Sequence, residues 1–167
     1  MLSKNIPWIC FLLLANTLQF SISQDVCRKS KSIKIDNSEA KCVNVSWYVY
    51  AGSVPCDGCC IRRNMVVLES GILQVTDTTT VNGQTSSVTF TAQRFNDYAT
   101  YFVAGYSLPL KIVDTDCETY GVVYSEITNI LQVFTAEPEQ TPTFLSKLKG
   151  VKRCSMPLYE YNPELNC

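Results

Sequence analysis

The stretch Lys-Ile-Val-Asp-Thr-Asp-Cys-Glu-Thr-Tyr-Gly-Val-Val-Tyr-Ser-Glu, residues 111–126, decides the fold that we expect for this chain. Two apolar runs, residues 110–113 and 121–124, flank the polar segment 114–119. Valine, isoleucine and tyrosine favour strands, whereas aspartate and threonine favour the turn between them. The stretch therefore predicts a β-hairpin, which by itself would fit many all-β domains.

The chain on either side of this hairpin alternates short strand-like runs with turns. Asn82-Gly83 lies between two such runs and predicts a second hairpin, because both residues tolerate positive φ. Around it, apolar residues alternate with Thr, Ser and Gln, which indicates an antiparallel sheet with one solvated face. The predicted strands are residues 45–51, 61–69, 72–80, 84–93, 98–106, 110–113, 119–125 and 130–134. Eight strands in meander order predict a closed up-and-down barrel, since closure removes exposed edges.

One helix is predicted after the last strand, over residues 141–150. Thr141 is a good N-cap, Pro142 suits the first helical position, and Gly150 can end the helix. An apolar helical face is formed by Phe144, Leu145, Leu148 and Val151. The tail from residue 153 to 167 is expected to be irregular.

The order of residues 113–125 resembles the second signature of the lipocalins, as found in retinol-binding proteins and apolipoprotein D-like proteins. In that family this segment is the turn between strands F and G, at the closed end of an eight-stranded barrel. Cys117 stands where the family usually has Tyr. The resemblance also implies a helix after the eighth strand, packed against the outside of the barrel.

Trp47 and Tyr48 resemble the first lipocalin signature, Gly-x-Trp-Tyr, although Val45 takes the glycine position. In the family this Trp plugs the closed end of the barrel; a core Trp of any β domain would be equally buried. Residues 135–137 lack the Arg of the third signature, and the loop at 53–58 is short and ends among three cysteines. The chain therefore resembles an outlying lipocalin.

Residues 1–23 have the features of a secretory signal peptide. Lys4 supplies a positive charge, residues 9–14 are apolar, and Ser21 and Ser23 are small residues suited to cleavage. A signal anchor is the alternative. No second stretch is long and apolar enough to span a bilayer, so residues 24–167 are predicted to be one secreted domain. Asn44 begins the sequon Asn-Val-Ser and is a predicted glycosylation site.

Cysteine content is the strongest compositional feature. Cys10 lies in the leader and would be removed with it. The cysteines that remain are even in number, which in a secreted chain predicts a disulfide framework. Cys56-x-x-Cys59 could also be a redox motif or half of a zinc site, but it lacks a surrounding βαβ pattern and the chain has no His. The predicted disulfide cysteines are Cys27, Cys42, Cys56, Cys59, Cys60, Cys117, Cys154 and Cys167.

The lipocalin resemblance also motivates one disulfide pairing. It places Cys117 at the closed end of the barrel, where the N-terminal arm enters the first strand. We therefore expect Cys117 to bond Cys27, with Cys42 as the second choice, because a disulfide needs neighbouring Cα atoms. Cys154 and Cys167 would then tie the tail to the cluster at residues 56–60.

Enzymatic activity is not expected. The absence of His excludes the usual catalytic triads, imidazole bases and haem ligation by His. We find no Gly-rich phosphate loop and no paired-carboxylate motif, and we predict no catalytic residue, cofactor or metal site. The formal net charge of −1 gives no reason to expect nucleic acid or a polybasic membrane contact.

The resemblance implies a carrier of a small hydrophobic ligand, such as a lipid, retinoid, steroid or pigment, because an eight-stranded barrel can hold one small ligand. The lining is expected to be apolar and uncharged, with no inward carboxylate for an amine ligand. Plain core packing without a ligand is the alternative for each of these residues. Alternation along the strands and the family motif predict the lining Trp47, Val49, Ala51, Leu110, Ile112, Gly121 and Val123.

The rival hypothesis is a disulfide-rich interaction module or inhibitor that acts on a host protein or scavenges a mediator. Salivary lipocalins of blood-feeding arthropods, which this Cys-rich chain also resembles, do both jobs. Displacement of a fluorescent fatty acid distinguishes the two hypotheses.

Overall fold

The computed structural model describes residues 27, 29, 31–34, 45–56, 58–68, 72–95 and 98–161. The predicted signal peptide, the sequon at Asn44 and the cysteines Cys42 and Cys167 lie outside the described residues. Within the described part of the chain, no helix is long and apolar enough to cross a membrane.

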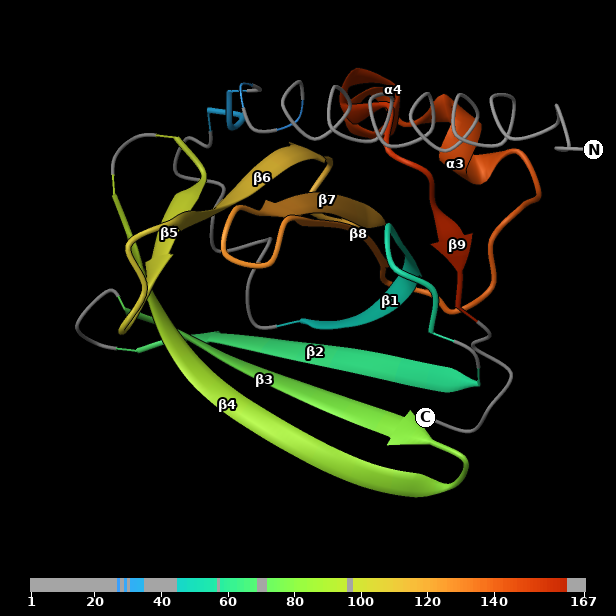
Figure 1. Cartoon of the computed structure of the whole chain (residues 1–167), viewed down its shortest axis with the longest axis horizontal. Helices are drawn as coiled ribbons and strands as arrows, with labels where there is room; N and C mark the ends of the chain where they lie inside the picture. The colour runs from blue at the N-terminus through green and yellow to red at the C-terminus, as the bar shows by residue number, and fades with distance from the viewer. Residues whose placement is uncertain are drawn as a thin grey trace, which may run out of the picture.

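Eight antiparallel strands close into a barrel, as the sequence predicts (Figure 1). Each strand pairs with the next along the chain, and β1 pairs with both β2 and β8, which closes the ring. The strands are β1 (Ser46–Gly52), β2 (Cys59–Val67), β3 (Ile72–Val81), β4 (Gln84–Arg94), β5 (Thr100–Val103), β6 (Pro109–Thr115), β7 (Tyr120–Ser125) and β8 (Ile130–Thr135). A two-residue strand, β9 (Tyr159–Glu160), adds to β1 from outside the ring.

The hairpin β3–β4 turns at Asn82-Gly83, which confirms the prediction. Both residues have positive φ, 50° and 77°, the conformation that a two-residue turn of this kind requires. On the outer face of this hairpin, hydroxyl groups pair across the strands; the pairs are Thr76–Thr89, Thr78–Ser87 and Thr80–Thr85, each at 3.0 Å. This ladder explains why a solvated face carries so many Thr and Ser residues.

The hairpin β6–β7 forms where residues 111–126 predict it. Between its strands, one carboxylate oxygen of Asp116 accepts hydrogen bonds from the backbone N–H groups of Glu118, Thr119 and Tyr120, at 3.0, 2.8 and 3.0 Å. Cys117 takes the left-handed conformation, with φ of 63°. The aspartate therefore fixes this turn by satisfying its backbone donors.

The helical region after β8 lies outside the barrel but is not one continuous helix. Two short helices, α3 (Phe144–Lys147) and α4 (Lys149–Cys154), are separated by Leu148, whose extended ψ of 122° interrupts the hydrogen-bond pattern. The N-cap of α3 is Thr143 and not Thr141. Leu148 is buried against the barrel, so the break places its side chain in the core.

Gly150 was expected to end the helix, and that prediction is wrong because Gly150 lies inside α4. A Cβ at this position would stand 2.6 Å from the Cβ of Asp114 on β6. The glycine therefore allows α4 to approach the barrel closely. The approach also lets the Gly150 N–H donate a hydrogen bond of 2.7 Å to the Asp114 carboxylate.

Hydrophobic clusters lie on both sides of the barrel wall. Outside it, side chains of β1, β6, β7 and β8 pack beneath α3 and α4, and this cluster includes Tyr50, Val113, Val122, Leu131 and Val133. In Figure 1 these helices and β9 lie along one side of the barrel, whereas β2, β3 and β4 form the opposite wall. The wall from β6 to β1 is thus apolar on both faces.

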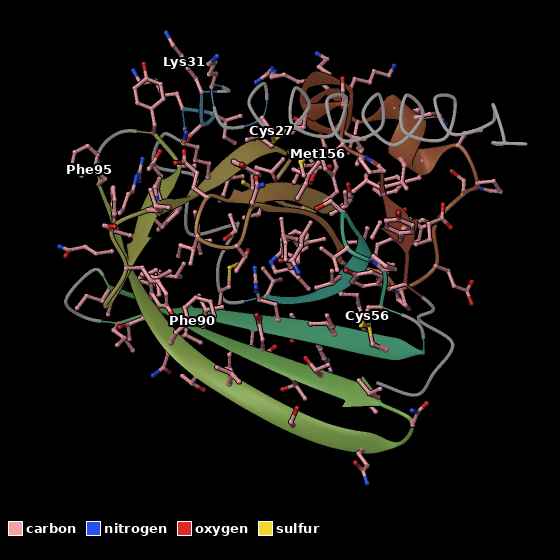
Figure 2. All side chains as sticks on the ribbon, in the orientation of Figure 1. Cys27, Lys31, Cys56, Phe90, Phe95 and Met156 are labelled. Carbon is pink, nitrogen blue, oxygen red and sulfur yellow. A yellow bond between two sulfur atoms is a disulfide. The ribbon has the colours of Figure 1, made fainter. Side chains whose placement is uncertain are left out.

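The disulfides correct the predicted pairing. Cys27 bonds Cys154 at the end of α4, with Cα atoms 4.3 Å apart. Both side chains are fully buried in the cluster outside the barrel, and Figure 2 shows Cys27 and Met156 together near the helices. The arm at residue 27 therefore lies beside the helices and not at the Cys117 turn, so the predicted Cys27–Cys117 bond is wrong.

The expectation that Cys154 ties the tail to residues 56–60 is also wrong, because Cys154 is occupied by Cys27. Within that cluster, Cys56 bonds Cys59. Cys60 and Cys117 are each in a disulfide as well. The second-choice partner of Cys117, Cys42, stays a prediction.

Candidate ligand cavity

A cavity lies inside the barrel and is lined mostly by apolar side chains. The empty space in and around it, open solvent included, amounts to about 710 Å³. Every strand of the ring contributes to its wall; the lining residues are Trp47, Arg63, Met65, Leu73, Val75, Phe90, Ala92, Tyr101, Leu110, Ile112, Thr115, Gly121, Val123 and Phe134.

Five of the seven residues predicted to line the pocket do line it: Trp47, Leu110, Ile112, Gly121 and Val123. Trp47 is buried, with 3% of its surface exposed, near the start of β1. These five come from β1, β6 and β7, and alternation was read correctly along β6 and β7. Their role in binding a ligand stays a prediction.

Val49 and Ala51 do not line the cavity. Val49 does point inward, but it packs in a neighbouring interior cluster with Cys59, Phe134 and Tyr161. Ala51 belongs to the cluster outside the barrel. The register of β1 against β8 shifts between Val49 and Ala51, and this irregularity breaks the two-residue alternation that the prediction assumed.

The interior cluster beside the cavity is completed by the segment after β9. Tyr161 is buried there, and its hydroxyl donates a hydrogen bond of 2.8 Å to the carbonyl of Val54. Burial raises the pKa of the Tyr161 phenol. The Cys56–Cys59 disulfide borders the same cluster, and Figure 2 shows Cys56 and Phe95 at opposite ends of the barrel.

The sequence prediction missed a charged pair in the barrel. Arg63 on β2 lines the cavity and faces Asp77 on β3, its direct cross-strand partner. Nε and Nη2 of Arg63 each donate a hydrogen bond of 2.6 Å, to Oδ1 and Oδ2 of Asp77. The two side chains expose only 12% and 23% of their surface. The expectation of an uncharged lining is therefore wrong.

The Arg63 guanidinium is also held by an aromatic ring. Its central carbon lies 4.6 Å from the centroid of the Phe134 ring, a cation–π contact. Alternation could have revealed the pair, because Ile61, Arg63 and Met65 share one face of β2. The lining was predicted only along the strand that holds Trp47 and along the hairpin of residues 111–126. Arg63 on β2, a charged residue between two apolar ones, was therefore not considered together with Asp77 on the next strand.

A metal centre finds no support in the described part of the chain. No three residues among its cysteines, aspartates and glutamates come together in a way that could hold an ion. The site is therefore characterised by its apolar wall and by the Arg63–Asp77 pair.

Comparison with known proteins supports the fold. No protein-family model and no curated protein matches the chain. The structure is similar to that of the cockroach major allergen Per a 4, with a TM-score of 0.61 and 20% sequence identity, over 79% of this chain and 92% of that chain. It is also similar to siderocalin Ex-FABP, described as acting through dual ligand specificities, with a TM-score of 0.53 and 15% identity, over 64% and 80% of the two chains. Both are lipocalins, so the barrel has the lipocalin fold.

Proposed function

We propose that this lipocalin-like barrel is a secreted carrier that binds a small hydrophobic ligand in its interior. The observation that supports the proposal is the closed ring of eight strands around a cavity with a mostly apolar lining. A site of this kind favours apolar molecules, because moving apolar surface out of water stabilises the complex by about 25 cal/mol per Å². A few polar groups then fix the orientation of the ligand.

Secretion is part of the proposal and rests on the predicted signal peptide at residues 1–23. The Cys27–Cys154 and Cys56–Cys59 disulfides agree with it, since such bonds persist in oxidising compartments. Glycosylation at Asn44 and the absence of enzymatic activity also stay predictions. A carrier needs neither a catalytic group nor a cofactor.

Binding of diphenylhexatriene, a fluorescent hydrocarbon without polar atoms, tests this function. We expect saturable fluorescence with the parent protein. Val123→Asp places an unpaired charge in the lining, which is costly in apolar surroundings, so we expect at least tenfold weaker binding. Val66→Asp is the matched control, because Val66 is 45% exposed on β2 and lies on the opposite face from the lining residues Arg63 and Met65.

Circular dichroism separates loss of binding from loss of folding in these variants. The expected result is a folded Val123→Asp barrel with weak binding and a Val66→Asp protein that binds as the parent does. If folded Val123→Asp binds the hydrocarbon as tightly as the parent, the proposed cavity is not the binding site.

A further inference from the structure

The Arg63–Asp77 pair restricts the class of ligand that this cavity can take. A guanidinium has five N–H hydrogens, and Asp77 accepts two of them. Among the described residues, no protein acceptor meets the other three. Since Arg63 lines the cavity, these donors mark the place where a ligand atom can accept a hydrogen bond.

The other polar residues in the lining are already engaged. The hydroxyl of Thr115 donates to the carbonyl of Tyr120 and accepts from the backbone N–H of Cys117, at 2.9 Å in the second case. Trp47 and Tyr101 each have a partner of their own. Arg63 is thus a lining residue whose N–H groups are only partly used by acceptors in the described part of the chain.

The charge of the pair decides between ligand classes. Asp77 neutralises Arg63 in a two-point ion pair, so the wall carries no net charge at this place. A ligand carboxylate on the remaining N–H groups would share one guanidinium with Asp77, and the two anions would repel each other. A ligand ammonium offers only donors and would be repelled by Arg63.

We propose that the cavity takes a neutral, largely apolar ligand with one hydrogen-bond acceptor, such as a ketone or ester carbonyl, that binds the unused N–H groups of Arg63. This proposal rests on the proposed carrier function and adds the chemical class of the ligand. The Phe134 ring covers one face of the guanidinium. The acceptor therefore approaches along the guanidinium edge, in the plane of its N–H groups.

A set of ligands with equal chain length tests the class. Methyl decyl ketone, dodecane, dodecanoate and dodecylammonium are compared by their ability to displace diphenylhexatriene from the parent protein. We expect the ketone to bind about tenfold more tightly than dodecane, because hydrogen bonds to charged groups are stronger than those between neutral groups. We expect it to bind at least tenfold more tightly than either ion.

The double variant Arg63→Met, Asp77→Leu tests the role of the pair. Removing both charges together leaves no unpaired charge inside the barrel, so we expect the variant to fold and to bind diphenylhexatriene. The variant should bind the ketone and dodecane about equally tightly. The matched control is Arg62→Met, which removes the next arginine of β2, on the opposite face and 5.6 Å from the Tyr48 ring centroid.

The outcomes separate this inference from the carrier function. Equal or tighter binding of dodecanoate or dodecylammonium by the parent would overturn the neutral-ligand class. A ketone preference that survives in the double variant would overturn the role of Arg63. Failure of the parent to bind diphenylhexatriene or any ligand of the set would instead overturn the carrier function itself.

Discussion

At the scale of single residues, Gly52 shows how a missing side chain positions the wall of the barrel. A Cβ at this place would stand 2.2 Å from the hydroxyl oxygen of Tyr161 and 2.8 Å from its ring. The Tyr161 ring therefore occupies the space that any other residue at position 52 would need. In the sequence this glycine looks only like the end of a strand. Its packing role is not visible there, because Tyr161, its neighbour in space, lies more than a hundred residues later in the chain.

Gly52→Ala is expected to destabilise the protein by about 1–3 kcal/mol, the usual cost of overfilling a packed interior. The clash would displace Tyr161 and weaken its hydrogen bond to the Val54 carbonyl. The free energy of unfolding in urea measures the effect. Gly121→Ala is the control, because its new Cβ would only make an ordinary 3.7 Å contact with Thr115. Equal stability of Gly52→Ala and the parent would contradict the packing described.

At the scale of secondary-structure elements, the sequence predicted best where local chemistry decides the structure. The turn at Asn82-Gly83 and the hairpin around Asp116 depend on neighbouring residues, and both are confirmed. The bulge in β1 and the break at Leu148 result from packing against distant segments. Local patterns carry no signal for such contacts, so Ala51 was placed wrongly, and the break in the helical region and its end beyond Gly150 were missed.

The Asp116 turn predicts a pH dependence of stability. Partial burial raises the pKa of Asp116, but hydrogen bonds from the Thr119 side chain and from three backbone N–H groups outweigh it and hold the pKa below its usual value. A lowered pKa in the folded state means that this stabilisation is present above the pKa of the unfolded chain. It is lost as the pH falls through the lower, folded-state pKa.

Asp116→Asn removes this contribution. The variant should therefore lose up to about 1 kcal/mol at neutral pH, a modest amount because the turn is exposed to water. Its unfolding free energy should also fall less steeply than that of the parent in acid. Urea titrations from pH 7 to below the usual Asp pKa provide the measurement, and parallel curves for the two proteins would refute the role of the carboxylate.

At the scale of the whole molecule, the barrel is supported unequally around its circumference. The wall of β6, β7, β8 and β1 is covered by the two helices, and the Cys27–Cys154 disulfide joins the N-terminal arm to the end of α4. This bond closes a loop with a sequence separation of 127 residues. In the chain-entropy model such closure stabilises the fold by roughly 5 kcal/mol. The sequence predicted a disulfide framework but could not show that Cys27 pairs with Cys154, because the pairing depends on where the N-terminal arm lies.

The cavity faces the inside of this same wall and the β2–β3–β4 wall opposite it. Alternation within single strands found five of its lining residues, all on β1, β6 and β7. It did not find Arg63 and Asp77, because a buried ion pair becomes recognisable only when the register between two strands is known. The proposed carrier function requires that a ligand enter the space between the two walls.

Nuclear Overhauser contacts between bound diphenylhexatriene and isotope-labelled methyl groups test this claim most directly. We expect contacts to the methyl groups of Leu73, Ile112 and Val123, which line the cavity. We expect none to Val113 and Val122, which lie next to them in sequence but pack outside the barrel. Contacts confined to exposed residues such as Val66 and Leu68, with none to Ile112 or Val123, would contradict the account.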